Sequence, residues 1–449
     1  MIFFLLLSFA SAEFLTPVDE DVDNSTLPEF CNEEHIISCV LVRPDPAALL
    51  SSSLEVAGVV LDLLDQPGND TFTFETEDGD EAIFTVDEET GDIWGNAVMA
   101  DGRDFVLEPS PESCEGCHAW IEEDRENFPT DYKVELPPAS EEMSRSLAAW
   151  NSKKKALFAK GKEDKTTLVT FTVKVYYTPE VKKGVKNLAK MVENMIGKTN
   201  QGYINSKIPI RVKLHCLEQT EKSESEGMTT LRAFAESKVT GSKLRGSADA
   251  AALLVMHHAT AAGVGVMPMH MKPDEIASWR FPDMMISLTV AQYATSSNVF
   301  GHEISHNFGN DHDQYDKQNN VFPWGLGYHI PGLDVRTLMA YVRPEKFGGG
   351  YRKDINFYSN PDVKFKGVPT GKKGVANAAR VIREHRFAIA AIGDESEKCS
   401  SVSSGSSSGS TTAAPATPGP ATPGPSTTDS NNYGDYDYGT SGRGGRLSN

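Results

Sequence analysis

The chain has 449 residues, of which 39% are hydrophobic, and this is enough for two or three domains with ample buried cores. This size excludes a small scaffold that would need its six cysteines for stability. The net charge of −20 is unevenly spread: residues 13–150 contain 35 acidic and 5 basic side chains, whereas residues 151–449 contain 28 acidic and 38 basic ones. The acidic half is either simply well solvated or docks electrostatically onto the basic half.

The N-terminus begins with a short apolar run. Residues 1–12 end in Ala-Ser-Ala, a small-x-small pattern typical of signal-peptide cleavage, and they are too few to span a bilayer. A buried strand or a membrane anchor is the alternative interpretation. No other stretch is long and apolar enough for a membrane span, so we expect a secreted, extracellular protein without a membrane anchor. Asn24 and Asn69 begin Asn-x-Ser/Thr sequons and are glycosylation candidates.

Residues 13–165 form an acidic segment with a β-like centre. Its first part, residues 13–50, is acidic and contains prolines, which predicts poor order. Apolar and polar residues alternate in 71–75 and 82–86, on either side of an Asp-Gly-Asp turn, and further strands are expected near residues 93–95 and 105–109. A charged connector follows at residues 121–165, and its exposed basic end would suit proteolytic activation.

Residues 166–396 alternate between strand and helix patterns, which predicts a mixed sheet with packed helices. Residues 250–257 are continuously apolar and predict a buried central strand, while residues 284–288 predict an edge element. The other expected elements are strands at 168–177 and 208–216 and helices at 185–196, 225–240, 297–307 and 375–392.

The C-terminal residues 397–449 consist largely of Ser, Thr, Gly, Pro and Ala, and the unit Ala-Thr-Pro-Gly-Pro occurs twice in succession. Such a composition cannot bury a core and is typical of a disordered, mucin-like tail.

A cluster of histidines in the predicted helix 297–307 carries the strongest chemical signal. His302 and His306 are four residues apart and lie on one face of a helix, and Glu303 lies one step round it. Gly309 lets the backbone leave the helix, so that His312 can return as a third ligand. His-Glu-x-x-His alone arises by chance on amphipathic helices. The added glycine and third histidine predict a catalytic zinc site with an open fourth position.

A second motif follows downstream. Met339 lies in the run Arg-Thr-Leu-Met-Ala-Tyr and resembles the methionine turn of the metzincin zinc proteases, although a lone methionine is more often core filler. Asp313, directly after the third histidine, is similar to the reprolysin (adamalysin) branch. Similarity to that branch covers roughly residues 166–396 and, more weakly, the β-rich propeptide-like segment 13–165 before them.

The resemblance implies an α/β (α+β) fold, with a metzincin-like catalytic domain that has a mixed twisted sheet and an active-site helix, preceded by a β-rich prodomain. It implies one catalytic Zn²⁺ ion held by His302, His306 and His312, with Glu303 as general base for peptide hydrolysis. The expected partners are protein or peptide substrates and the chain's own acidic propeptide, acting as an intramolecular inhibitor of a latent precursor. Nucleic acid is not expected as a partner.

The cysteines leave the origin of this latency open. Cys114 and Cys117 lie near the end of the propeptide-like segment, and a thiolate from either would block the zinc, as the family's cysteine switch implies. The alternative is a disulfide, either between these two or with Cys31 or Cys39. Cys216 and Cys399 are the only cysteines in the catalytic half and are candidates to pair with each other.

Two other functions compete with an active protease. The first is a catalytically silent binding protein that keeps the fold, although the intact Glu303 and histidine set argue against it. The second is a matrix or mucus component, which only the tail suggests. His257 and His258, which follow the predicted central strand, are expected to be strand-end residues and not metal ligands.

Overall fold

The structure is a computed structural model, and the residues it describes belong to one compact unit that ends at Ser400. The described residues are 12–18, 27, 31, 36–68, 70–110, 113–124, 132–134, 156–237, 244–258, 261–268, 284–295, 297–315, 322–342 and 352–393. The sequons at Asn24 and Asn69, Cys399, the C-terminal tail and most of the predicted signal peptide lie outside them.

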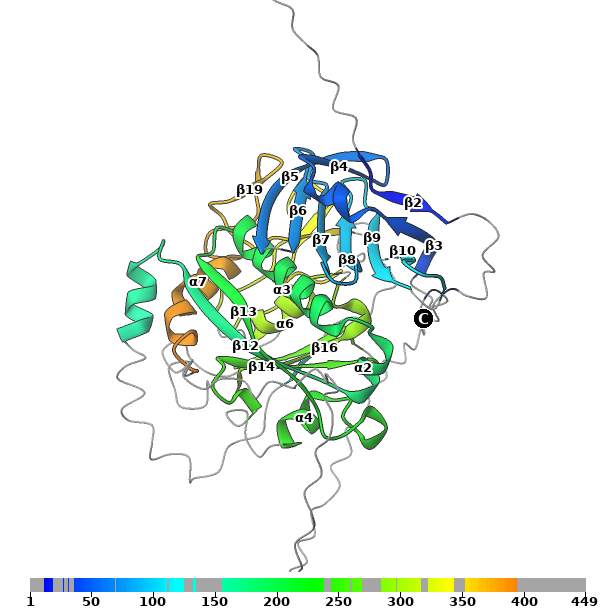
Figure 1. Ribbon diagram of the computed structural model, residues 1–449. Coiled ribbons are helices and arrows are strands. Elements are labelled where there is room, and N and C mark those ends of the chain that lie inside the picture. The colour runs from blue at the N-terminus through cyan, green and yellow to red at the C-terminus, as the bar shows by residue number, and fades with distance from the viewer. Residues whose placement is uncertain are drawn as a thin grey trace, which may run out of the picture. The chain divides into compact units, whose positions relative to one another are not determined.

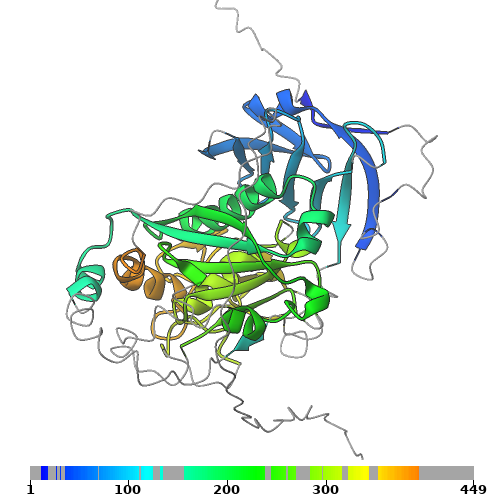
Figure 2. The same cartoon turned by 60° about the horizontal axis from the view of Figure 1, so that its bottom comes forward.

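The N-terminal part of the chain is a ten-stranded sheet, coloured blue to cyan in Figures 1 and 2. Its strand order is β1-β4-β5-β6-β7-β8-β9-β10-β3-β2, and the run from β4 to β10 is an antiparallel meander. The bounds are β1 Ala12–Glu13, β2 Leu15–Pro17, β3 Ile36–Pro44, β4 Ser53–Val56, β5 Val59–Gly68, β6 Thr71–Glu75, β7 Glu81–Val86, β8 Ile93–Val98, β9 Asp104–Pro109 and β10 His118–Glu123.

This sheet curls until its two edges meet. The edge strands β1 and β2 are joined through Phe14, which is 1% exposed and belongs to the core of the sheet. The alternating segments at 71–75 and 82–86 do form neighbouring strands. The prediction of poor order across 13–50 is wrong for residues 36–44, because β3 pairs along its length with β10.

The part of the chain from residue 132 to residue 393, called the catalytic part after the function that its sequence predicts, contains a six-stranded mixed sheet with the order β11-β15-β16-β14-β12-β13. Only the β15–β16 pair is antiparallel among these neighbours. The strands are β11 Tyr132–Val134, β12 Val169–Tyr177, β13 Ile210–Gln219, β14 Ala250–Val255, β15 Gly263–Val266 and β16 Ile286–Val290. Beside them lie α2 Pro179–Gly184, α3 Leu188–Asn205, α4 Leu231–Ser237, α6 Val299–Asn307 and α7 Ala378–Ile389, together with the short strands β17 Val335–Thr337, β18 Lys353–Ile355, β19 Lys364–Phe365 and β20 Val368–Pro369.

Strand β14 is the centre of this part, as its apolar sequence predicts, and all six of its residues are buried. Successive side chains of a strand point to opposite faces of the sheet, so those of β14 pack into two different clusters. Leu254 packs into the cluster that contains residues of α3, α6 and α7, whereas Leu253 packs into the one that contains residues of α4. The prediction of an edge element at 284–288 is wrong, because β16 lies between β14 and β15.

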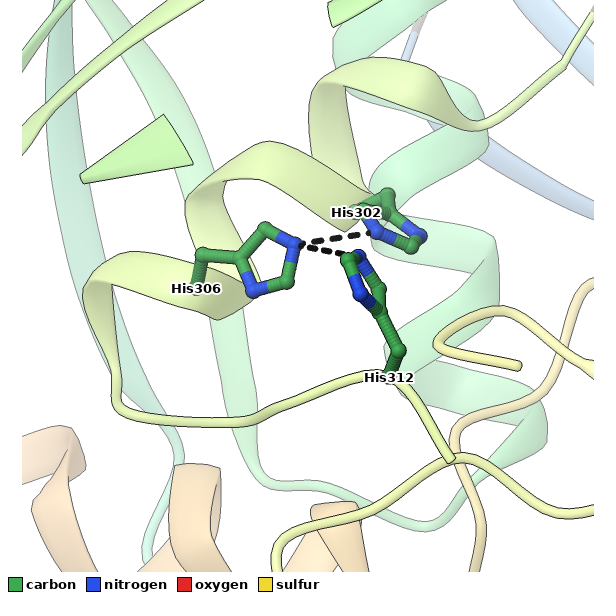
Figure 3. A group of neighbouring side chains, drawn as sticks. All are labelled: His302, His306 and His312. Carbon is green, nitrogen blue, oxygen red and sulfur yellow. Dashed lines mark hydrogen bonds between the residues drawn. The ribbon is translucent and has the colours of Figure 1, made fainter. Parts of the chain in front are cut away.

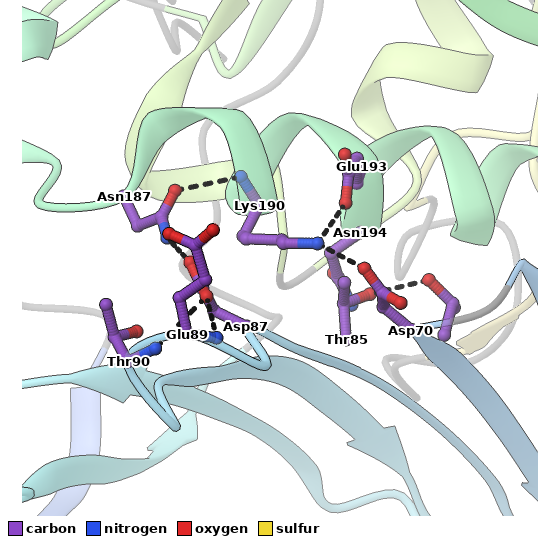
Figure 4. A network of polar contacts seen from close by, with 10 residues as sticks. Asp70, Thr85, Asp87, Glu89, Thr90, Asn187, Lys190, Glu193 and Asn194 are labelled. Carbon is purple, nitrogen blue, oxygen red and sulfur yellow. Dashed lines mark hydrogen bonds and ion pairs between the residues drawn. The ribbon is translucent and has the colours of Figure 1, made fainter. Parts of the chain in front are cut away.

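Helix α3 carries the contact between the two sheets (Figure 4). It begins at Asn187, whose side chain caps the helix by accepting from the Lys190 amide and also donates to Asp87. Lys190 forms ion pairs with Asp70 of the N-terminal part and with Glu193 of its own helix. Among the described residues, the acidic N-terminal sheet thus contacts α3 through the ion pair of Asp70 with Lys190 and through hydrogen bonds from the side-chain amides of this helix.

No helix in the described part of the chain combines the length and the apolar composition needed to cross a bilayer.

Candidate metal centre

Helix α6 carries the first two histidines and is buried along its whole length. It begins at Asn298, whose side chain accepts from the Gly301 amide and satisfies one of the free donors of the first turn. The helix ends at Asn307, and Gly309 follows with φ of 97°, a conformation that favours glycine. The turn predicted from Gly309 is therefore present, and it brings the chain back toward the helix.

The three histidine rings meet at one buried point (Figure 3). The Nε2 atoms of His302 and His306 are 3.1 Å apart, and those of His306 and His312 are 3.0 Å apart. His302 is 5% exposed, and His306 and His312 are fully buried. The spacing predicted from the sequence thus gives a converging set of three nitrogen donors.

Hydrogen bonds to backbone carbonyls fix the tautomers of His302 and His306. The Nδ1 of His302 lies 2.6 Å from the Leu338 carbonyl oxygen, and the Nδ1 of His306 lies 2.9 Å from the Asn310 carbonyl oxygen. A carbonyl only accepts, so each Nδ1 carries the proton, and in the neutral ring each Nε2 presents a lone pair.

Two lone pairs about 3 Å apart in a buried site repel each other unless a proton or a cation lies between them. A divalent metal ion shared by all three nitrogens satisfies this donor set, and carbonyl partners for the ligand histidines are typical of metal sites. The residues present therefore fit a zinc ion.

Glu303 follows His302 on α6 and is 0% exposed. Strand β15 passes against it, and two of its residues are glycines. A Cβ atom at Gly263 would lie 2.6 Å from Glu303 Oε1, and one at Gly265 would lie 3.0 Å from Oε2. Any side chain at these two positions would collide with the carboxylate. The strand therefore approaches α6 so closely that only glycine leaves room at these two positions.

Asn307 at the end of α6 ties the helix to the sheet. Its side-chain amide donates to the Val266 carbonyl of β15 at 2.8 Å and to the Ile286 carbonyl of β16 at 2.9 Å. These two bonds fix the helix against the strand that borders Glu303. No sequence pattern predicts this role, because it depends on strands that are distant in the chain.

The segment with Met339, which resembles a methionine turn in sequence, lies against the histidines. Met339 is fully buried in the same core cluster as residues of α3 and α6, and its neighbour Leu338 holds His302. The ring of Tyr341 lies over the ring of His312, with 3.6 Å between the ring centroids. Tyr341 was not among the residues predicted for the site.

Asp313 joins the histidine loop to this turn. Its Oδ2 accepts from the Tyr341 amide at 3.1 Å and lies 3.3 Å from His329 Nε2, and its Oδ1 accepts from the Tyr315 amide at 2.9 Å. Asp313 and His329 are both buried. His329 carried no spacing signal in the sequence, and the fold alone brings it to this carboxylate.

The cysteines form disulfides. Cys114 is bonded to Cys117 and Cys31 to Cys39, and Cys216 is disulfide-bonded as well. The first bridge closes the turn between β9 and β10, which corresponds to the disulfide alternative for this pair. A disulfide sulfur is not a thiolate, so in this state neither Cys114 nor Cys117 offers the ligand that a cysteine switch requires.

His257 and His258 are not part of this histidine group. Within the described ranges, the three-histidine group is the only set of His, Cys, Asp or Glu side chains close enough to share an ion. His257 and His258 follow β14, and the backbone amide of His257 donates to Glu224 Oε2 at 3.1 Å. Their position at the end of the strand agrees with the interpretation from sequence.

Comparison with known proteins places the histidine site inside a recognised domain. Residues 167–341 match the family model Reprolysin_5, described as metallo-peptidase family M12. A peptidyl-Asp metalloendopeptidase of Stenotrophomonas maltophilia (strain K279a) is 26% identical over 318 residues, which are 68% of this chain and 69% of that protein. A protein of the same name from Xanthomonas campestris pv. campestris is 28% identical over 217 residues, which are 46% of this chain and 47% of that protein.

Solved structures give weaker likenesses. A chain in the structure of a chaperone–substrate complex has 20% identity and a TM-score of 0.34, over 50% of this chain and 35% of that chain. Metalloproteinase-II from Bacteroides fragilis has 10% identity and a TM-score of 0.29, over 58% of this chain and 75% of that one. At such scores neither structure carries an argument about this fold.

Proposed function

We propose that this chain, a zinc metalloendopeptidase with a metzincin-like domain of the reprolysin type over residues 167–341, is a secreted enzyme made as a latent precursor with Glu303 as its general base. The observation that carries the proposal is the convergence of three buried imidazole nitrogens beside one buried carboxylate. His302, His306 and His312 would hold the zinc ion.

The chemistry divides between the ion and the protein. Bound zinc would supply Lewis acidity, which acidifies water and polarises a scissile carbonyl. Glu303 would accept the proton of the attacking water and return it to the leaving amine. The carbonyls of Leu338 and Asn310 would keep two of the histidine rings oriented and their Nε2 atoms deprotonated.

Peptides that contain aspartate are the first substrates to test. The relatives named above are peptidyl-Asp metalloendopeptidases, and we carry that preference to this chain as a proposal. A pair of peptides that differ only by Asp or Asn next to the scissile bond measures it. A ratio of kcat/KM above about 10 in favour of Asp would support the preference, and equal rates would remove it.

Latency and secretion form the finer part of the proposal. The N-terminal part packs against α3 through Asp70, Asp87 and Thr85, which supports a role as a docked propeptide. Disulfides suit an oxidising, extracellular compartment. Glycosylation at Asn24 and Asn69 would accompany export, and mass spectrometry of the secreted protein with and without deglycosylation tests it.

The role of Glu303 has a direct test in a matched pair of variants. Glu303→Gln should keep zinc and lower turnover of casein by about 100-fold or more, because it removes the base but none of the nitrogen donors. His306→Ala should lose both zinc and activity. Full activity of Glu303→Gln would show that Glu303 is not the general base. Hydrolysis that resists a chelator would contradict metal dependence.

A further inference from the structure

The turn between β9 and β10 carries a disulfide that the proposed peptide hydrolysis does not use. It joins Cys114 to Cys117, which are three residues apart in the sequence Cys-Glu-Gly-Cys. A bridge that closes so short a loop restricts the unfolded chain less than a bridge that closes a long one. A gain in stability therefore explains this bridge poorly.

Backbone hydrogen bonds close the same turn without help from the sulfur atoms. The amide of Cys117 donates to the carbonyl of Cys114 at 3.1 Å, and Gly116 between them has φ of 70°. The carbonyl of Cys117 in turn accepts from the amide of Ser110 at 2.8 Å. These bonds remain available when the sulfurs are separated, so a reduced pair of thiols stays at a high effective concentration and closes again readily.

His118 fixes this turn from the side of β8. The amide of Ile93 donates to its Nε2 at 2.9 Å, so the ring proton is on Nδ1, which donates to the Gly116 carbonyl at 3.2 Å. Burial lowers the pKa of His118 to about 4. The ring is therefore neutral near pH 7 and adds no charge beside the sulfurs.

The two sulfur atoms differ in exposure and in charge environment. Cys117 is 1% exposed, whereas Cys114 is half-buried, so a reagent from solvent reaches Cys114. The Nη2 of Arg43, on β3, lies 3.8 Å from the Sγ of Cys114. A guanidinium is always charged and stabilises a thiolate beside it, while the exposed Glu115 of the same turn carries the opposing charge. The accessible sulfur is thus also the one whose anion has a cationic partner.

We propose that the bridge between Cys114 and Cys117 is a redox-active disulfide that exchanges with an external thiol, and that Cys114 is the sulfur attacked. In the first step an external thiolate bonds to Cys114 Sγ, the S–S bond breaks, and its electron pair leaves on Cys117, which takes a proton from water. A second external thiolate attacks the external sulfur of the mixed disulfide and releases the Cys114 thiolate beside Arg43. Two external thiols are oxidised to one disulfide, and the bridge is reduced to two thiols.

The chain contains a matched control in the bridge between Cys31 and Cys39. This bridge also closes a short loop, of sequence separation 8, in the same N-terminal part. Both of its cysteines pack against an apolar cluster, which consists of Val106, Ala119 and Ile121. Apolar surroundings disfavour a thiolate, so exchange at this bridge should be slow.

The first experiment uses the full-length wild-type chain. Reduced glutathione or reduced thioredoxin is added at pH 7, samples are quenched with an alkylating reagent, and mass spectrometry locates the labelled cysteines. We expect the bridge in the β9–β10 turn to be reduced at least about 10-fold faster than the bridge between Cys31 and Cys39. The faster of the two reductants identifies a small-molecule or a protein source of the thiol. Equal rates at the two bridges with both reductants would overturn the inference.

Single-thiol variants test which sulfur reacts. With oxidised glutathione, Cys117→Ser should form a mixed disulfide at Cys114 at least about 10-fold faster than Cys114→Ser forms one at Cys117. Equal rates would overturn the assignment of Cys114. In the Cys117→Ser background, Arg43→Ala should move alkylation of Cys114 to higher pH, and Arg43→Lys should restore most of the shift. An unchanged pH profile in Arg43→Ala would overturn the role of Arg43. None of these measurements involves peptide hydrolysis, so their outcome is independent of the proposed function.

Discussion

Gly265 shows at the residue scale how closely the active-site helix and the sheet approach each other. A Cβ at this position would lie 2.5 Å from the Glu303 carbonyl oxygen, which is backbone and cannot rotate away. Gly265→Ala should therefore displace β15 or α6 and lower kcat/KM by at least about 10-fold, because small misplacements of catalytic groups are costly. Val264→Ala, on the neighbouring residue, removes only buried apolar atoms and should keep most of the activity. Wild-type kcat/KM in Gly265→Ala would contradict the close approach.

The residues of the histidine cluster differ in how far the sequence alone could predict them. The helix, the turn at Gly309 and the return of His312 span eleven residues, from 302 to 312, so local geometry was enough to predict them. Asn307 contacts β15 and β16, which precede it far along the chain. His329 and Tyr341 contact Asp313 from positions well downstream of it. Such contacts follow from tertiary structure, and no spacing rule identifies them.

Helix α3 is one of the elements that join the two sheets, and Asn194 is a buried contact on it. The Asn194 amide donates to Thr85 Oγ1 at 3.1 Å and to the Trp94 carbonyl at 3.2 Å, both on the N-terminal sheet. Asn194→Ala leaves these acceptors without their donor and should weaken docking by about 1–3 kcal/mol. In protein cut in the connector, less N-terminal fragment should co-purify with the catalytic part.

Asn200 on the same helix offers the matched control. Its side chain pairs with Val212 of β13 in both directions, at 3.0 and 2.7 Å, and makes no such bond to the N-terminal sheet. Asn200→Ala should lower the thermal stability of the catalytic part and leave co-purification unchanged. Equal losses of the fragment in both variants would mean that docking does not depend on Asn194.

The strands of the two sheets differ in how well their sequences predict them. Alternation identifies β6 and β7, since one face of each is packed in the core of the curled sheet. Strand β15 reads Gly-Val-Gly-Val and is fully buried, so its pattern gives no polar face, and β11 is three residues long. Only the pairing between them shows that the connector completes the catalytic sheet.

At the scale of the whole molecule, half-buried carboxylates couple the docking of the N-terminal sheet to pH. Burial raises the pKa of Glu108 to about 7, although Thr295 Oγ1 donates to its Oε1 at 3.0 Å. Burial also raises the pKa of Glu81, against hydrogen bonds from Asn205 and Asn356. Both carboxyl groups are more readily protonated when the N-terminal sheet is docked than when it is not. The stabilisation that protonation gives to the docked state is therefore complete below about pH 4.5, and it is lost as pH rises through the pKa of the docked state.

A pH series of thermal unfolding measures this effect. Between pH 4.5 and 7 the wild-type chain should lose about 1–2 kcal/mol through Glu108, a modest value because that side chain is only partly shielded from solvent. Glu108→Gln keeps the shape but cannot ionise, so its melting temperature should fall less over this range. Parallel pH profiles of the two proteins would contradict the coupling.

The zinc content of the purified full-length chain tests the central claim most directly. After loading with zinc and dialysis, elemental analysis should find one zinc ion per chain in the wild type and in Glu303→Gln. It should find almost none in His302→Ala, His306→Ala and His312→Ala, since each removes one of the three converging nitrogens. A folded wild-type chain without zinc, or full zinc in all three alanine variants, would contradict the account.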